Sequence, residues 1–177
     1  MEPLEIERKF LIRMPSLAML DALCTRRIAI TQTYLLPGPE GETRRLRRSR
    51  EGDRETLYFT EKKHITDITR VEREREISPE EYAALLTDAD GERRPIEKVR
   101  RCIPYEGHTL EIDVFPFWTD RAFCECELSR EDEALSLPPW LEVVREVTGD
   151  RRYTNNALAR CIPAEEPGGS PGGASFT

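Results

Sequence analysis

The chain has 177 residues, of which 38% are hydrophobic and 34% charged, a size that fits one domain with a hydrophobic core or one domain and a tail. Its net charge of −7 argues against general nucleic-acid binding, which normally needs a basic excess or one basic face. No run of about 18 apolar residues could span a membrane, and the N-terminus lacks the segments of a signal peptide.

The cysteines favour a reducing compartment. There are five of them, an odd number, and no two show a C-x-x-C spacing. We therefore expect free thiols and a cytoplasmic protein. Cys124 and Cys126 share one strand face, but no histidine or second cysteine pair accompanies them, so a zinc site is not expected.

Alternating polarity and β-branched residues predict eight strands, and stretches with helical spacing predict four helices. In chain order we expect a strand at 4–13, a helix from Pro15 to about Cys24, strands at 27–36, 43–50, 55–63 and 70–77, a helix from Ser78 to Asp90-Gly91, strands at 96–103, 107–115 and 121–129, and helices at 140–148 and 153–160. Because turns join most of the strands, the sheet should be largely antiparallel.

Local signals place the helix ends and the domain boundary. Ser78 is a good N-cap and Pro79 suits the first position of the helix that follows it. Gly149 should end the helix predicted at 140–148. Beyond Pro163 the chain becomes rich in Gly, Pro and Ser, which is typical of disorder. We therefore predict one domain over 1–162 and a disordered tail over 163–177.

Charged residues recur at every second position on almost every predicted strand, so they lie on one face of each strand. The face holds seven bases and eight acids: Glu5, Glu7, Lys9, Arg45, Arg47, Lys62, Arg70, Glu72, Glu74, Lys98, Arg100, Glu111, Asp113, Glu125 and Glu127. In a sandwich of two sheets this would be the solvated outer face. In a closed barrel it would line the interior.

The opposite face favours the barrel. On the strands of Glu111 and Glu125 the alternate residues are apolar, which suits a wall covered by the amphipathic helices that follow Ser78 and Pro139. An eight-stranded barrel has an interior that can hold one small ligand. So many buried charges would be costly unless they bound ions, and metal cations with a polyphosphate would neutralise both sets. We expect an α+β fold: an eight-stranded antiparallel β-barrel with helices packed on the outside.

Across residues 4–160 the sequence resembles the CYTH, or triphosphate tunnel metalloenzyme, superfamily. The motifs that carry the resemblance are Glu5-x-Glu7-x-Lys9, Gln32-x-Tyr34-Leu35, Arg45-x-Arg47, Thr60-x-Lys62, Arg70-x-Glu72-x-Glu74-x-x-Ile77, Lys98-x-Arg100, Glu111-Ile112-Asp113, Glu125-x-Glu127, and Glu146-Val147-Thr148-Gly149-Asp150 with Arg152-Tyr153-x-Asn155. Arg151 departs from the proline that often stands before the Arg-Tyr pair. The resemblance implies a tunnel that binds a triphosphate with Mg²⁺ or Mn²⁺.

The resemblance also implies residue roles. The metal carboxylates would be Glu5, Glu7, Glu125 and Glu127; the phosphate-binding residues would be Lys9, Arg45, Arg47, Lys62 and Arg100. Lys98 and Tyr34 would prepare the attacking water, and Glu72, Glu74 and Asp113 would orient the basic side chains. The pKa of Lys98 should be lowered by burial and by Arg100, but whether Lys98 is a base or a phosphate ligand stays open.

The first functional expectation is a metal-dependent hydrolase that converts tripolyphosphate to phosphate and pyrophosphate. The alternatives are a thiamine triphosphatase, a class IV adenylate cyclase, for which Tyr58 is the main base-stacking candidate, and a non-catalytic polyphosphate-binding module. A homodimer is possible, and no nucleic-acid or membrane partner is expected. His64 and His108 lie near predicted turns and should be exposed.

Overall fold

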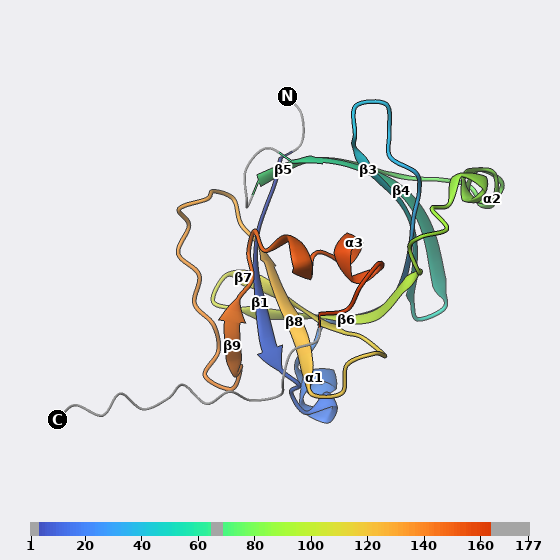
Figure 1. Ribbon diagram of the computed structural model, residues 1–177. Coiled ribbons are helices and arrows are strands. Elements are labelled where there is room, and N and C mark those ends of the chain that lie inside the picture. Colours follow the sequence, from blue (N-terminus) through green and yellow to red (C-terminus); the bar gives the residue numbers. More distant parts are fainter. Residues whose placement is uncertain (1–3, 65–68, 164–177) are drawn as a thin grey trace.

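The computed structural model describes residues 4–64 and 69–163 (Figure 1). Within this part of the chain, nine strands form one antiparallel sheet in the order β5-β4-β3-β2-β6-β7-β8-β1-β9. The strands are β1 (Leu4–Arg13), β2 (Arg26–Tyr34), β3 (Thr43–Glu51), β4 (Arg54–His64), β5 (Thr69–Glu76), β6 (Ile96–Tyr105), β7 (His108–Val114), β8 (Arg121–Glu127) and β9 (Val143–Glu146). A single sheet excludes the two-sheet sandwich. Of the tail predicted over 163–177, residues 164–177 lie outside the described residues.

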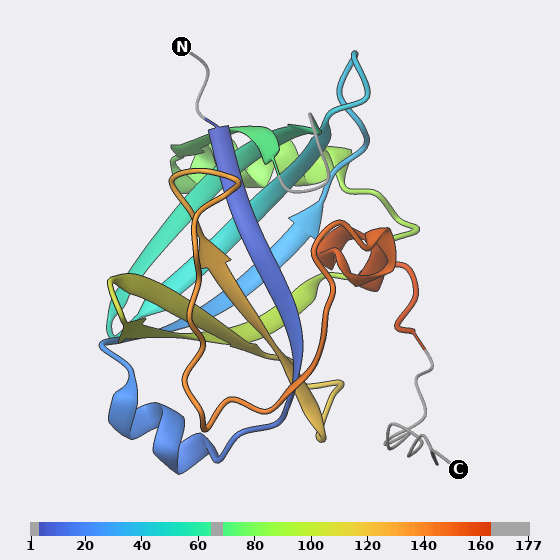
Figure 2. The same ribbon diagram turned by 90° about the vertical axis from the view of Figure 1, so that its left-hand side faces the viewer.

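The sheet curls around a central space. Strand β1 pairs with β8 from Glu7 to Arg13, and it also pairs with β5 at Leu4↔Val71, Glu5↔Arg70 and Ile6↔Thr69. Figures 1 and 2 show the strands arranged around this space and tilted relative to one another. Side chains alternate across each strand, so the charged residues face inward and their apolar neighbours face outward.

The helices of the described chain are short. They are α1 (Leu17–Leu23), α2 (Pro79–Leu85) and α3 (Asn155–Leu158), with 3₁₀ turns η1 (Leu86–Asp88) and η2 (Arg151–Tyr153). Ser78 caps α2 as expected, because its hydroxyl accepts from the backbone N–H of Glu81 at 3.1 Å. Figure 1 shows α1 and α2 outside the ring of strands, whereas α3 lies over its opening. The expectation that all helices pack on the outside is therefore wrong for α3.

The helix predicted at 140–148 is also wrong, because Val143–Glu146 forms strand β9. This strand pairs with β1 at Phe10↔Glu146 and Leu11↔Arg145. The β-branched Val143 and Val144 suit a strand, and β1 offers an edge with which this segment pairs. Glu146 is further held by Arg8, whose Nε and Nη2 each donate to its carboxylate at 2.8 Å.

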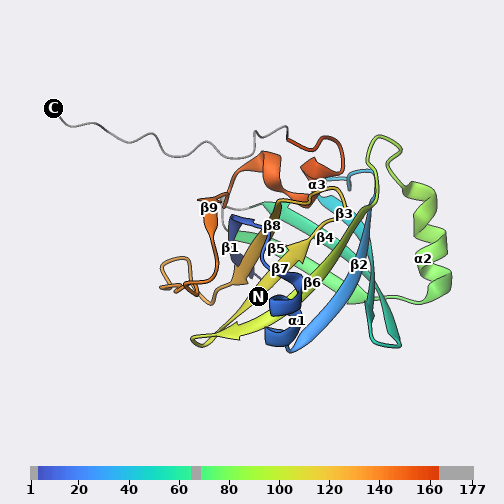
Figure 3. The ribbon, with the colours of Figure 1, turned by 90° about the horizontal axis from the view of Figure 1, so that it is seen from below.

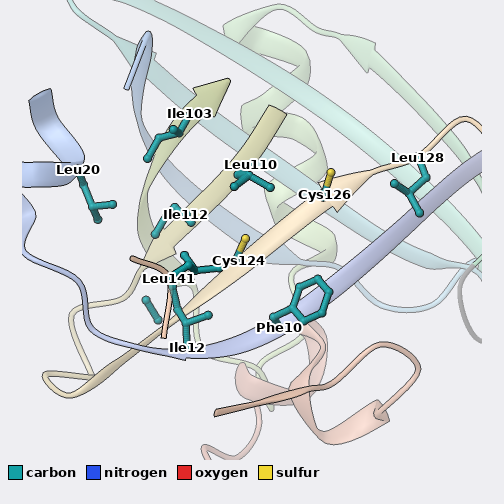
Figure 4. Close-up of a cluster of buried hydrophobic side chains, with 11 residues drawn as sticks. Phe10, Ile12, Leu20, Ile103, Leu110, Ile112, Cys124, Cys126, Leu128 and Leu141 are labelled. Carbon is teal, nitrogen blue, oxygen red and sulfur yellow. The ribbon is translucent and has the colours of Figure 1, made fainter. Parts of the chain in front are cut away.

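The outward face of β1, β6, β7 and β8 forms the largest hydrophobic core (Figure 4). Leu20 of α1 and Leu141 of the segment before β9 pack against it, so these two pieces cover this wall. Cys124 and Cys126 belong to this core on the face opposite Glu125 and Glu127, as predicted, and all five cysteines are free. A second wall, on β3 and β4, is covered by Tyr82 of α2.

The inward face is not charged along its whole length. After Lys9 and Glu125, the next inward residues are Leu11 and Phe123, both almost fully buried. They join an aromatic cluster that includes Tyr153 of η2. This cluster gives the interior an apolar floor at one end, and the Nζ of Lys9 lies 4.1 Å from the centroid of the Phe123 ring.

Replacing Ile112 by alanine should lower the free energy of unfolding by about 2–5 kcal/mol, because it leaves a cavity under a fully covered side chain. Ile112 has no exposed surface in the outer core. Val144→Ala is the matched control, since half of Val144 is exposed and its loss should change stability by about 0.5 kcal/mol or less. Urea denaturation of both variants measures the difference, and equal losses would contradict the placement of Ile112.

No helix within the described chain combines the length and apolar character that crossing a bilayer requires.

Candidate active site in the sheet interior

A cavity of about 440 Å³ lies inside the curled sheet. Nearly all of the predicted site residues line it: Glu5, Glu7, Lys9, Tyr34, Arg45, Arg47, Lys62, Glu72, Glu74, Lys98, Arg100, Glu125 and Glu127. Asp113 lies behind this lining and is fully buried against Lys98 and Arg100. The structure therefore brings together side chains from eight strands, as the alternating charge pattern predicted.

The deepest charges form one connected cluster. Glu125 accepts from the Nζ of Lys9 at 2.7 Å and from the Nη2 of Arg100 at 2.5 Å. Arg100 also donates from its Nε to Asp113 at 2.7 Å, and the second oxygen of Asp113 pairs with the ammonium of Lys98. All of these side chains are buried or nearly so, and their pairing offsets the cost of removing the charges from water.

Lys98 has a strongly perturbed pKa. Complete burial lowers the pKa of its ammonium group to about 8, and the neighbouring Arg100 acts in the same direction, against Asp113 and Glu125. Burial opposes the charged form of Glu125 as well, but Lys9, Lys98 and Arg100 outweigh it and hold the pKa of Glu125 well below its usual range. Lys98 can therefore lose its proton close to neutral pH, while the carboxylate beside it stays ionised.

A second cluster centres on Lys62. Its Nζ lies 2.6 Å from a carboxylate oxygen of Glu5 and 2.5 Å from one of Glu72. Glu5 comes from β1 and Glu72 from β5, the two strands that meet where the sheet curls back on itself. One ammonium group thus joins the two strands, and it faces the cavity.

Arg45 and Arg47 are held more loosely. Arg45 lies 3.5 Å from Glu72 and 3.8 Å from Glu74, and Arg47 lies 3.4 Å from Glu74. The Nε atoms of both arginines are buried and have no hydrogen-bond partner among the described residues. Thr60 donates to Glu74 at 2.7 Å and fixes its position. Buried guanidinium donors without partners are what an incoming oxyanion would satisfy.

Tyr34 lies at the edge of this arginine pair. Its hydroxyl donates to the Oε1 of Gln32 at 3.4 Å, and Arg45 donates to the same oxygen at 3.5 Å. Burial raises the pKa of Tyr34, so the phenol stays neutral in the physiological range. Its oxygen can therefore take part in hydrogen bonds at the cavity but is not a base by itself.

The cavity also presents carboxylate oxygens for a cation. Glu7 stands opposite Glu127 across β1 and β8, and Glu111 stands opposite Glu125 across β7 and β8. Oxygen donors of this kind suit a hard divalent ion. Within the described residues, however, no three acidic, histidine or cysteine side chains are already arranged around one point. The donor chemistry therefore fits Mg²⁺ or Mn²⁺, and binding would require carboxylates such as Glu125 to leave their basic partners.

Sequence reasoning missed part of the lining. Glu111 was placed on the inward face without a role; it lines the cavity and pairs with Arg100, and burial raises its pKa. The segment after β9 also contributes Thr148, Asn155 and Asn156. This segment carries the final motif of the resemblance, which was the available signal, but only the fold shows that it closes over the opening.

His108 and Tyr58, two other singled-out residues, are not part of the cavity lining. His108, expected to be exposed, has a side chain only 16% exposed, with its Nε2 2.9 Å from an oxygen of Glu133. The side chain of His64 lies outside the described part.

Comparison with known proteins gives a consistent result. Residues 3–154 match the family model described as the CYTH domain. The chain is 34% identical over 164 residues to an inorganic triphosphatase of Nitrosomonas europaea, covering 90% of this chain and 99% of the relative. It is 38% identical over 104 residues to an inorganic triphosphatase of Acetivibrio thermocellus, covering 58% and 65% of the two chains.

Solved structures agree in fold. The structure of the inorganic triphosphatase NE1496 is 31% identical, covers 90% of this chain and 96% of its own, and gives a TM-score of 0.54. The PH1819 protein from Pyrococcus horikoshii OT3 is 20% identical, covers 72% and 80%, and gives a TM-score of 0.56.

Proposed function

The chain belongs to the CYTH family, and from this premise we propose that it is a metal-dependent hydrolase that splits inorganic triphosphate into phosphate and pyrophosphate. The observation that carries the proposal is the cavity, in which lysines and arginines from several strands converge with a set of carboxylates of similar size. A linear triphosphate with a divalent cation is a ligand that matches both sets.

The scaffold that we propose for this activity is an eight-stranded tunnel, with β9 as an additional edge strand. The pairing of β1 with β5 supports it, because it joins the two sides of the curled sheet. The helix α3 and the turn η2 lie over one opening of this tunnel. The closed ring of strands, with α3 and η2 over one opening, would exclude bulk water from the cavity. The exclusion of water strengthens the attraction between basic side chains and phosphate.

Substrate binding is assigned to Lys9, Arg45, Arg47, Lys62 and Arg100. The two arginines of β3 support this best, because their buried Nε donors have no partners among the described residues. Guanidinium groups can bind phosphate oxygens through two parallel hydrogen bonds. Lys9 and Lys62 would exchange their carboxylate partners, Glu125 and Glu5, for phosphate oxygens.

Metal binding is assigned to Glu5, Glu7, Glu125 and Glu127. When lysines and Arg100 turn to phosphate, these carboxylates need a new positive partner, and a divalent cation supplies it without leaving buried charge unpaired. These four carboxylates would hold a Mg²⁺ or Mn²⁺, whose positive charge would offset the negative charge of the phosphate groups. Glu72, Glu74 and Asp113 would keep orienting the basic side chains.

Catalysis is assigned to Lys98 with Tyr34. Phosphoryl transfer needs in-line positioning and charge stabilisation more than covalent catalysis. With a pKa of about 8, a part of the Lys98 side chains is neutral near pH 7.5 and could accept a proton from the attacking water. The neutral hydroxyl of Tyr34 would hold that water, and Asp113 would receive the hydrogen bonds of the lysine that results.

The lining disfavours the nucleotide and thiamine alternatives. Its aromatic side chains in the described chain are Tyr34 and Tyr153, and both are almost fully buried, at 3% and 1% exposed. Neither offers an open ring on which an adenine or a thiazolium could stack. We also place the protein in the cytoplasm, which its five free cysteines favour.

A substrate panel tests the proposed function. With Mg²⁺ and then Mn²⁺, we expect kcat/KM for tripolyphosphate to exceed the values for thiamine triphosphate and ATP by tenfold or more. Phosphate and pyrophosphate should appear in equal amounts, and ATP should yield no cyclic AMP. A higher kcat/KM for thiamine triphosphate would make that ester the substrate. Tight binding of tripolyphosphate by calorimetry without turnover would instead identify a binding module.

A further inference from the structure

One part of the outer sheet surface is not covered by any helix of residues 4–64 and 69–163. Figure 3 shows β2 between α1 on one side and α2 on the other, with no helix over it. A groove of about 480 Å³ lies here, and outward side chains of β2, β3, β6 and β7 make up most of its lining. We call this the open face; it is defined by Ala29, Thr31, Arg48, Arg50, Glu97, Val99 and Val114.

The charges on the open face lie in one row. Thr31 of β2 is directly opposite Arg48 of β3 on one side and directly opposite Glu97 of β6 on the other. Directly opposite residues of antiparallel strands point to the same face, so the row reads positive, neutral, negative across three strands. Arg48 and Glu97 are exposed, and neither forms an ion pair within the described part of the chain. The guanidinium of Arg48 lies 5.5 Å from the centroid of the Tyr82 ring, a contact that leaves its charge without an acidic partner.

The next row on the open face is small and apolar at its centre. Ala29 of β2 is opposite Arg50 of β3 and Val99 of β6, and Val99 is opposite Val114 of β7. Arg50 is already paired with Glu55 at 2.9 Å. The small side chains at the centre are what leave the groove open.

We propose that the open face is the docking surface for a second copy of this chain, related by a twofold axis that runs parallel to β2. Such an axis lays β3 of one copy over β6 of the other. Because the rotation does not shift residues along the direction of β2, each row meets the same row of the partner. Arg48 of each copy then faces Glu97 of its partner, so two ion pairs form by symmetry. The apolar stem of Arg48 would enter the partner's groove between Thr31 and Val99.

Charge self-complementarity favours a second copy over a partner of another kind. A basic or acidic partner would pair with only one end of the row and would repel the other end. A twofold partner satisfies both ends at once, because it presents the same row reversed. This inference concerns the outer surface and is independent of the reaction proposed for the interior.

Charge reversal tests the proposal on the full-length protein. By sedimentation velocity we expect a concentration-dependent dimer, and Arg48→Glu or Glu97→Arg should raise its dissociation constant more than tenfold, because each places two like-charged pairs in contact. The double variant Arg48→Glu/Glu97→Arg should restore dimerisation. Arg130→Glu, which makes the same charge change on an exposed loop, should leave the dimer unchanged.

A second measurement locates the axis. Thr31 lies at the centre of the row, so Thr31→Cys in a Cys161→Ser background should be joined to its own copy by a short thiol cross-linker. A protein that stays monomeric at every concentration would overturn the proposal. So would a dimer that both single reversals leave intact, or a double variant that stays monomeric. Melting temperatures of all variants establish that they are folded.

Discussion

Lys98→Met is expected to lower kcat for tripolyphosphate about 10²–10⁴-fold, the range that general acid–base catalysis contributes. The side chain is completely buried at the cavity and is held in place by Asp113, as the proposed role of base requires. Methionine keeps most of the volume and removes the nitrogen. Single-turnover measurements on saturated enzyme give the loss in the chemical step separately from binding.

Lys98→Arg decides between the two roles open to this residue. Arginine keeps the positive charge but does not deprotonate, so a base would be lost whereas a phosphate ligand would be retained. We expect Lys98→Arg to bind tripolyphosphate yet to be nearly as slow as Lys98→Met. Binding without loss of rate in Lys98→Arg would contradict the role of base.

The pH profile gives an independent test of the same role. Since the lowered pKa of about 8 belongs to the free protein, the neutral amine increases as pH rises through 8. The kcat/KM of the wild-type protein should therefore rise about tenfold per pH unit below 8 and level off above it. If Lys98 were instead a phosphate ligand that must carry a positive charge, kcat/KM would fall as the pH rises above 8.

Removal of divalent cations is expected to abolish turnover, and Glu127→Gln should raise the Mg²⁺ concentration for half-maximal rate by about 10–100-fold. Glu127 stands opposite Glu7 on the neighbouring strand, and both face the cavity. Glutamine keeps the shape and removes the charge that a divalent ion requires. After a chelator has removed the divalent cations, the rate is measured at increasing Mg²⁺ concentrations. The electron paramagnetic resonance signal of free Mn²⁺ measures metal binding directly.

Glu142→Gln is the matched control for the metal titration. Its side chain is 68% exposed at the end of β1, where it pairs with Arg13. It does not line the cavity, so the same chemical change should leave the Mg²⁺ requirement unaltered. Turnover that survives complete chelation, or an equal shift in both variants, would contradict the assignment of the carboxylates.

The sequence predicted the strands and most of the lining well because alternation is a local property. Inward-facing Lys9, Lys62 and Lys98 follow from the two-residue period of single strands, without knowledge of which strands are neighbours. Burial of Cys124 and Cys126 on the opposite face follows in the same way. The side-chain types in this pattern also indicated the chemistry, since carboxylates suit divalent cations and basic side chains suit phosphates.

The pairing of those charges depends on contacts between distant parts of the chain. Glu5 meets Lys62, and Arg8 meets Glu146, because β1 lies between strands that are far away in sequence. The segment 143–146 looked helical by itself and became β9 because β1 offered it an edge. Local propensity is weak enough for such contacts to override it.

The sequence by itself determined which residues face inward, which ligand chemistry they suit and which family they resemble. Only the tertiary structure decided that Arg100 shares Glu125 with Lys9, that α3 lies over the opening, and that a charged row crosses the open face. The physical reason is that strand alternation needs only neighbouring residues, whereas register and pairing are fixed by the simultaneous packing of the whole sheet.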